Sequence, residues 1–218
     1  GKLILTAQGL TGNGKASFDR AALVSKLIKY DETVFSADTS DFVLDSEDPG
    51  RPALATTNMK SYVDLKNRYG DFISNGLGSY VTFPYNQYKC FIDRFRWLMD
   101  EKNVMFEDKT ASKGSKMGIP GAEFISIDPA QDSLRWYAEE AVYSLADYII
   151  RASGVKEIAV ADAKVYPDSS KLIVGTDALI QPLKQAKVIA DTASKYHVIS
   201  DATIRIKARR NYSGDGSY

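Results

Sequence analysis

The sequence predicts an α+β protein in which a C-terminal β-α-β-β-α-β unit follows an irregular, aromatic-rich N-terminal half. Residues 122–212 show strand and helix patterns in the order found in ferredoxin-like folds. Ten aromatic residues lie between positions 62 and 97, and long polar loops interrupt the first half. We therefore divide the chain into an irregular region, 1–121, and a C-terminal unit, 122–218, and leave open whether the two form one continuous domain.

Composition narrows the classes of function. A chain of 218 residues buries roughly 70% of its unfolded surface, so it needs no disulfide or metal to fold. Lys plus Arg and Asp plus Glu both number 28, so net charge supplies no attraction to nucleic acid or anionic membranes. Cys90 is the only cysteine, which excludes an intrachain disulfide, and His197 is the only histidine. We expect no metal site and no cofactor.

The hydropathy pattern bears on location. No apolar run approaches the roughly 18 residues of a membrane span, and the first residues lack the basic and apolar regions of a signal peptide. We expect a protein of the cytoplasm or of an assembled particle, without a signal peptide or transmembrane segment.

The first thirty residues resemble a strand, a glycine loop and a helix. Leu3-Ile4-Leu5 predicts a strand, and the pattern of residues 18–30 predicts an amphipathic helix. Between them, Gly9, Gly14 and Lys15 satisfy the G-x-x-x-x-G-K spacing of a phosphate-binding loop. A P-loop-like nucleotide-binding protein, with these three residues holding the nucleotide, is therefore the main enzymatic alternative.

Two features weigh against that alternative. Ala16 occupies the position of the magnesium-binding hydroxyl. The second acid required for the metal has three equivalent candidates, Asp128, Asp162 and Asp201, so none is singled out. We favour a simple chain reversal at Gly12-Asn13-Gly14, because Asn-Gly suits tight turns.

The second region combines acidic, aromatic and basic stretches. An acidic segment of residues 36–50 ends in the turn signal Asp48-Pro49-Gly50. Residues 87–100 predict a helix with an aromatic stripe, and the length of the polar loop 109–121 predicts a mobile or partner-bound arm. Basic residues interleave with the aromatics, so a nucleic-acid-binding module is a second alternative. We favour burial in a core or an interface, because the aromatics have helical spacing.

The third region has the clearest patterns. Residues 123–127 predict a strand, and Asp128-Pro129 predicts the start of a helix that ends at Gly154. Two strands, 157–166 and 171–174, precede a second helix over 177–196. In the final strand, 198–209, apolar residues alternate with Arg205, Lys207 and Arg209.

The favoured function is a non-enzymatic structural or assembly subunit of a larger complex, such as a virion, a filament or a secretion-type machine. The expected partners are other copies of the chain and other protein subunits, and nucleic acid is not favoured. The acidic segment and the basic last strand have opposite charge, which suggests a head-to-tail contact between copies. The candidate interface residues are Asp38, Asp41, Asp45, Arg205, Lys207 and Arg209.

Overall fold

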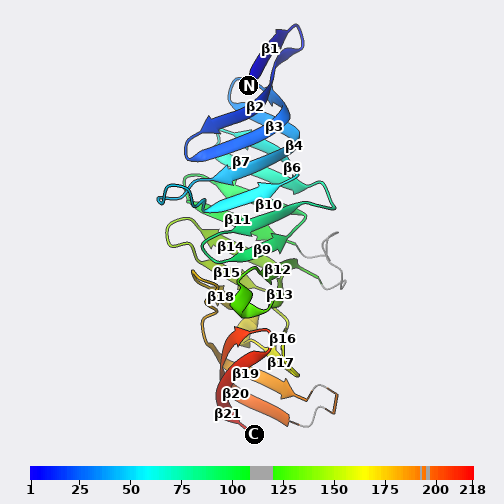
Figure 1. Cartoon of the computed structure of the whole chain (residues 1–218), viewed down its shortest axis with the longest axis vertical. Helices are drawn as coiled ribbons and strands as arrows, with labels where there is room; N and C mark the ends of the chain where they lie inside the picture. The colour runs from blue at the N-terminus through cyan, green and yellow to red at the C-terminus, as the bar shows by residue number, and fades with distance from the viewer. Residues whose placement is uncertain (109–119, 192, 195–196) are drawn as a thin grey trace.

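The computed structural model describes residues 1–108, 120–191, 193–194 and 197–218. Within these residues the chain forms twenty-one strands and two short 3-10 helices, and no α-helix. The predicted α+β class and ferredoxin-like unit are therefore wrong. One 16-stranded and one five-stranded sheet, both antiparallel, are stacked along the long axis, with the chain ends at opposite ends of the molecule (Figure 1).

The larger sheet folds into two layers around strand β4 (Val34–Leu44). Most of β4 pairs with β6, while its last two residues pair with β5. Layer A contains β5 (Leu54–Thr57), β8 (Tyr80–Phe83), β9 (Tyr88–Phe91), β12 (Ala122–Ser126) and β13 (Arg135–Ala138). Layer B contains β6 (Met59–Asp64), β7 (Tyr69–Ser74), β10 (Arg94–Leu98), β11 (Asn103–Glu107), β14 (Glu140–Ser144), β15 (Ile150–Ser153) and β18 (Leu172–Val174).

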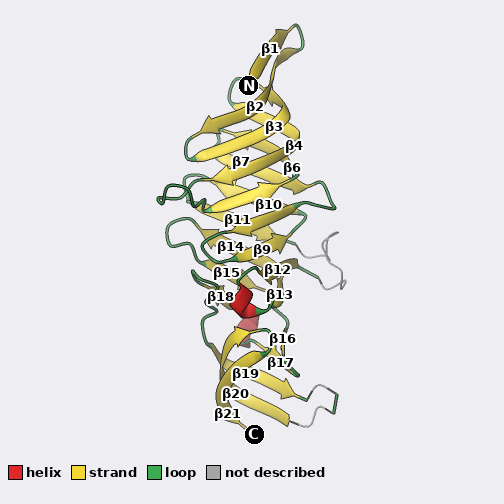
Figure 2. Ribbon diagram, viewed as in Figure 1, coloured by secondary structure: helices red, strands yellow, loops and turns green. Residues whose placement is uncertain are grey.

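Successive hairpins along the chain are added alternately to layer B and to layer A (Figure 2). Hairpins β6–β7, β10–β11 and β14–β15 belong to layer B, whereas β8–β9 and β12–β13 belong to layer A. The sandwich therefore grows along one axis as the chain proceeds. It draws strands from both sides of the boundary predicted at residue 121.

Strands β1 (Lys2–Thr6), β2 (Gly9–Phe18) and β3 (Ala21–Tyr30) extend the sheet beyond β4 and form the head of the molecule. The strand predicted at Leu3–Leu5 is confirmed, and the helix predicted over 18–30 is wrong. That helix required Leu23, Val24, Leu27 and Ile28 on one buried stripe. In strand β3, Leu23 and Ile28 are buried, whereas Val24 and Leu27 are exposed.

The five-stranded sheet forms the tail of the molecule. The strand predicted over 198–209 is confirmed as β20 with a shift of one residue, and its alternation is as expected. Ile204 and Ile206 are buried, while Arg205 and Lys207 are exposed. The strands of this sheet are β16 (Ile158–Val160), β17 (Ala163–Tyr166), β19 (Leu183–Ala190), β20 (His197–Ala208) and β21 (Asn211–Ser217).

The other predicted helices are also wrong. Residues 87–100 form β9 and β10, which lie in different layers, and β19 occupies part of the helix predicted over 177–196. The Asp128-Pro129 start does begin a helix, η1 (Pro129–Gln131), and Asp128 Oδ1 accepts a hydrogen bond from Ala130 N–H at 2.9 Å. The helix ends at once because Asp132 has a φ of 51°, and β13 to β15 follow. The second short helix is η2 (Asp168–Ser170).

Aromatic side chains from both layers form the core. Phe83 of layer A meets Tyr143 of layer B with ring centroids 4.9 Å apart, and Phe72 stacks on Phe95 at 4.6 Å. Most of the aromatics between positions 62 and 97 are buried, which agrees with the core interpretation. The mobile or partner-bound arm predicted at 109–121 lies almost entirely outside the described residues.

Candidate assembly surfaces

The glycine stretch of the head forms a strand. Gly9, Gly14 and Lys15 all belong to β2, the chain reverses at Ala7 and Gln8, and another strand follows. The turn predicted at Gly12-Asn13-Gly14 is wrong, because the pairing of β2 with β3 shows a register shift there instead. The stretch therefore does not have the strand-loop-helix backbone that the nucleotide alternative requires.

Several of the basic residues that interleave with the aromatics have partners within the fold. Arg96 forms two 2.7 Å hydrogen bonds with Asp71, and Lys89 Nζ lies 3.7 Å from the centre of the Tyr80 ring. Arg68 bonds to Asp19 at 2.6 Å and to Asp100 at 3.0 Å. The charges of these three cations are thus largely offset by local anions or a ring face.

The described residues contain no group of three His, Cys, Asp or Glu side chains that could hold a metal ion. Cys90 is buried, and burial raises the pKa of its thiol well above the ordinary value, so it stays protonated at neutral pH. None of the described helices has the length and apolar character needed to cross a membrane.

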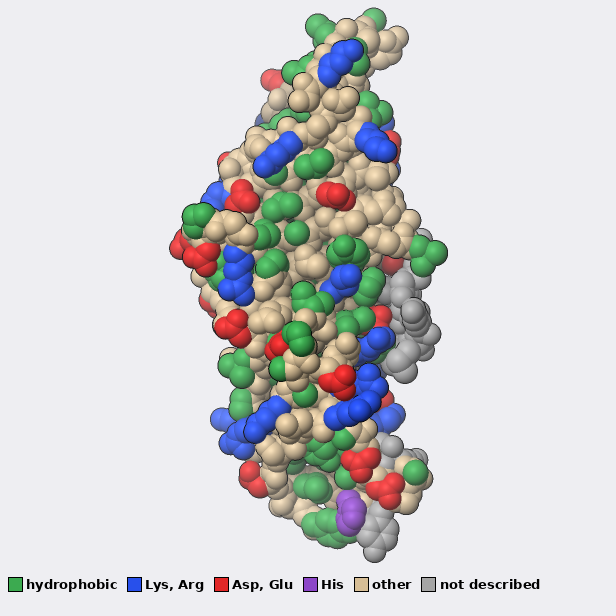
Figure 3. All heavy atoms as spheres, viewed as in Figure 1, with side chains coloured by type: hydrophobic (Ala, Val, Ile, Leu, Met, Phe, Trp, Pro, Cys, Tyr) green, Lys and Arg blue, Asp and Glu red, His purple; other side chains and the backbone are tan. Residues whose placement is uncertain are grey.

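The oppositely charged candidate residues lie toward opposite ends of the molecule. Asp38 and Asp41 are on β4 near the head, and Arg205 and Lys207 are on β20 in the tail (Figure 1). Figure 3 shows that acidic and basic side chains are both spread along the length of the face in view. Two lysines lie close to Asp38: Lys29 Nζ is 3.4 Å and Lys60 Nζ 3.7 Å from its carboxylate. The other two candidates, Asp45 and Arg209, directly follow β4 and β20.

The acidic candidates are therefore partly occupied within the chain. Asp41 Oδ1 also accepts a hydrogen bond, from Asn58 N–H at 2.9 Å. By contrast, Arg205, Lys207 and Arg209 form no ion pair with any described residue.

The head presents an apolar edge. Strand register places Leu3 opposite Gly12, Gly12 opposite Ile28, and Leu5 opposite Leu10. Paired residues lie on the same face of a sheet, so the face that carries buried Ile28 in β3 carries the two leucines in β1. The missing side chain of Gly12 leaves room for Leu3, since a Cβ atom at Gly12 would lie 2.8 Å from Leu3 Cδ2.

This inner face is covered where the two layers meet and uncovered at the head. Ile28 is fully buried, but Leu3 is 64% and Leu5 80% exposed. Among the described residues, β1 pairs only with β2. The head therefore combines an unpaired strand edge with two uncovered leucines, an arrangement that favours addition of another strand.

The tail ends in a second unpaired edge. Strand β21 pairs only with β20 among the described strands, and its seven residues are almost all exposed. Its inner face carries Gly214 and Gly216. The side chain of Ile204 on β20 occupies the space above Gly214: a Cβ atom at Gly214 would lie 2.5 Å from Ile204 Cδ1. Both ends of the molecule thus offer a strand edge.

Comparison of the chain with protein-family models, with curated proteins and with solved structures yields no match.

Proposed function

We propose that this chain is a non-enzymatic building block of a larger assembly, in which copies add head to tail through strand pairing. The observation that carries the proposal is the inner apolar face that continues to Leu3 and Leu5, where nothing in the described chain covers it. Strand β1 of one copy would pair with β21 of the next, which would satisfy both edges and cover the leucines.

The tail edge matches the head in residue spacing, and its glycines place no side chains of their own in the way of the leucines. Leu3 and Leu5 are two residues apart on β1, and Gly214 and Gly216 are two apart on β21. Within the chain, Leu3 already lies against a glycine of its neighbouring strand, Gly12. A contact between two different surfaces repeats without closing unless its rotation forms a ring. Among a virion, a filament and a secretion-type machine, this geometry favours a filament.

The free energy available from burying the leucines indicates that assembly depends on protein concentration. Leu3 is 64% and Leu5 80% exposed, so covering what remains exposed contributes about 2–4 kcal/mol. A dissociation constant of 1 μM requires about 8 kcal/mol. Hydrogen bonds along the added strand supply part of the difference, while ordering of the edge opposes it. We therefore expect assembly in the range of tens of micromolar or above.

Sedimentation as a function of protein concentration tests the proposal. The unmodified chain should form a series of species larger than the monomer, and the double variant Leu3→Lys/Leu5→Lys should remain monomeric. Leu77→Lys is the matched control, because Leu77 is 93% exposed in the β7–β8 turn. A monomeric unmodified chain at high concentration, or a double variant that assembles normally, would overturn the proposal.

A further inference from the structure

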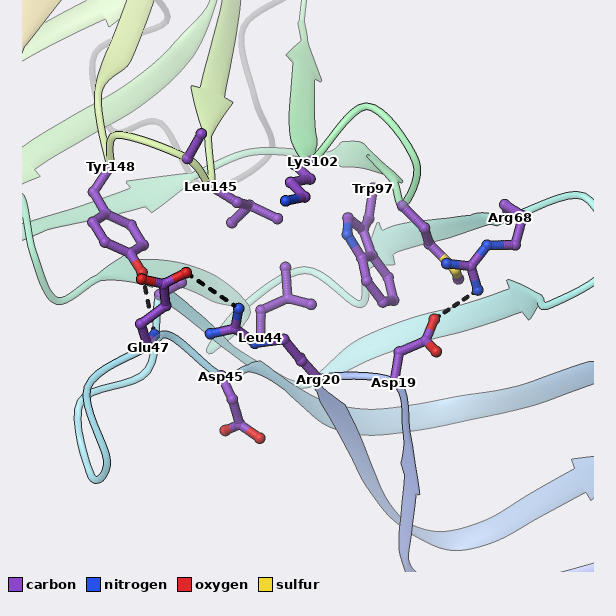
Figure 4. A pocket seen from close by; sticks show the side chains of 13 residues that line it. Asp19, Arg20, Leu44, Asp45, Glu47, Arg68, Trp97, Lys102, Leu145 and Tyr148 are labelled. Atoms are coloured by element: carbon purple, nitrogen blue, oxygen red, sulfur yellow. Dashed lines mark hydrogen bonds and ion pairs between the residues drawn. The ribbon is translucent and has the colours of Figure 1, made fainter.

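A cavity of about 540 Å³ lies at the seam between the two layers, away from both strand edges. The turns that follow β2, β6, β10 and β14 contribute to its wall, together with the loop between β4 and β5 (Figure 4). Ligand pockets commonly enclose about 300–1,000 Å³, so this cavity has the size of a small-molecule site.

The interior of the cavity is mainly apolar. Leu44, Ala53 and Trp97 are each less than 5% exposed, and Met99 and Leu145 extend the apolar lining. An apolar ligand body therefore finds matching surface here.

One hydrogen-bond donor in this lining has no acceptor among the described residues. The Nε1 atom of Trp97 is buried, and no described residue accepts a hydrogen bond from it. Figure 4 shows that edge of the indole directed toward Leu44, Leu145 and Lys102. A buried donor without a partner costs roughly 1–3 kcal/mol. Because indole N–H can only donate, a ligand that relieves this cost must present an acceptor.

The charges around the cavity select the kind of acceptor. Arg68 is held by Asp19 and Asp100, and Arg20 Nη1 lies 3.8 Å from Glu47. Lys102 forms no ion pair with any described residue, and Figure 4 shows its ammonium group extending toward the cavity. One available cation suits one negative charge. Three carboxylates, those of Asp19, Asp45 and Glu47, also line the cavity, and they disfavour a doubly charged phosphate.

We propose that this cavity binds a small carboxylate with an apolar body, whose carboxylate accepts a hydrogen bond from Trp97 Nε1–H and faces Lys102. The apolar body lies against Leu44, Met99 and Leu145. This site is separate from the strand edges and does not depend on assembly.

Titration of the isotope-labelled full chain with three probes tests the proposal by nuclear magnetic resonance. The probes are octanoate, octan-1-ol and octylammonium, which share a chain and differ in head-group charge. The protein has two tryptophans. Trp136 packs against Phe124 in the core, with centroids 4.0 Å apart, and serves as internal reference. Octanoate should shift the indole N–H resonance of Trp97 and leave that of Trp136 in place, and the other two probes should bind more weakly.

Variants identify the groups that hold the carboxylate. Lys102→Met should weaken octanoate binding about two- to fivefold without affecting octan-1-ol, whereas Lys184→Met, at an exposed position of β19, should change neither. Trp97→Phe should weaken octanoate binding about tenfold, the effect of losing a hydrogen bond to a charged group. If Trp97→Phe does not fold, the proposal is still tested by the Trp97 resonance shift in the unmodified chain and by the comparison of Lys102→Met with Lys184→Met.

Three results would overturn the proposal. They are an unmoved Trp97 resonance at millimolar octanoate, equal affinity for the three probes, and identical behaviour of the two lysine variants.

Discussion

Tyr85 and Tyr148 stack face to face, with ring centroids 4.0 Å apart and planes 8° from parallel. Tyr85 lies in the β8–β9 turn of layer A, and Tyr148 in the β14–β15 turn of layer B. The Tyr85 hydroxyl donates a hydrogen bond to Asp48 Oδ2 at 2.6 Å, and the Arg51 guanidinium lies 4.2 Å from the Tyr85 ring centre. The stack therefore ties the two layers and the β4–β5 loop together beside the cavity.

Removing one ring of this stack should weaken the joint between the layers. Tyr148→Ala should lower the free energy of unfolding by about 2 kcal/mol, because it loses the aromatic contact and its buried area. Tyr148→Phe is the control, since it keeps the ring and loses only the oxygen that accepts from Glu47 N–H at 3.3 Å. Urea unfolding measures both variants, and equal losses for alanine and phenylalanine would argue against a structural role of the stack.

Stability should decline in alkaline solution. Burial raises the pKa of Tyr88 and Tyr143 above the ordinary value of 10.0. In the unfolded chain these tyrosines lose their protons near that value, while the folded chain retains them. Their contribution is therefore complete below about pH 10 and is lost as the pH rises further.

Urea unfolding at a series of pH values from about 8 to 11 measures this decline. Tyr143 donates a hydrogen bond to the Ala53 carbonyl at 2.9 Å, so Tyr143→Phe should cost about 1 kcal/mol at neutral pH. It should also make the alkaline decline shallower, because one buried phenol is removed. A variant with an unchanged slope would contradict the assignment to Tyr143.

The direction of assembly can be read from cross-linking. Cys90 is fully buried, so an introduced surface cysteine is the reactive thiol. A mixture of Lys2→Cys on β1 and Ser213→Cys on β21 should yield cross-linked dimers with a short bis-maleimide, whereas each variant alone should not. Dimers formed by Lys2→Cys alone would instead indicate a symmetric contact between two heads.

Ionic strength should affect assembly only slightly. Lys29 and Lys60 offset the charge of Asp38, and Asp41 already accepts a hydrogen bond from Asn58 N–H, so these carboxylates are partly engaged within the chain. We expect the association constant to change by less than about threefold between low and high salt, in keeping with the small energies of exposed ion pairs. A strong salt dependence, reversed by Arg205→Glu with Lys207→Glu, would restore the ionic head-to-tail contact as the main interaction.

The sequence predicted strands where alternation was long or the apolar run was isolated. Strand β20 has twelve residues, which is enough for a period of two to emerge, and its exposed cations were identified correctly. Strands β9 and β10 have four and five residues. Apolar residues in two such strands and their connecting turn match a helical stripe equally well. The spacing of Tyr88 and Phe95, for example, fits one helix face, although the two residues belong to different layers.

The two candidate sites differ in how far the sequence indicates them. The apolar character of Leu3 and Leu5 is visible in the sequence, but their exposure depends on where layer A begins. The cavity combines residues as distant as Asp19 and Tyr148. The residues that line the cavity lie in turns or at strand ends next to turns. No local sequence pattern indicates that these turns meet. The unpartnered nitrogen of Trp97 is a property of tertiary packing alone.

The alternation of hairpins between the layers makes the length of the molecule adjustable. One hairpin in each layer adds two strands to each, and strands lie about 4.8 Å apart, so such a pair lengthens the body by roughly 10 Å. Neither end need change when the middle is extended or shortened in these steps. The fold can thus serve as a molecular spacer whose span is set by the number of hairpin pairs between two fixed ends.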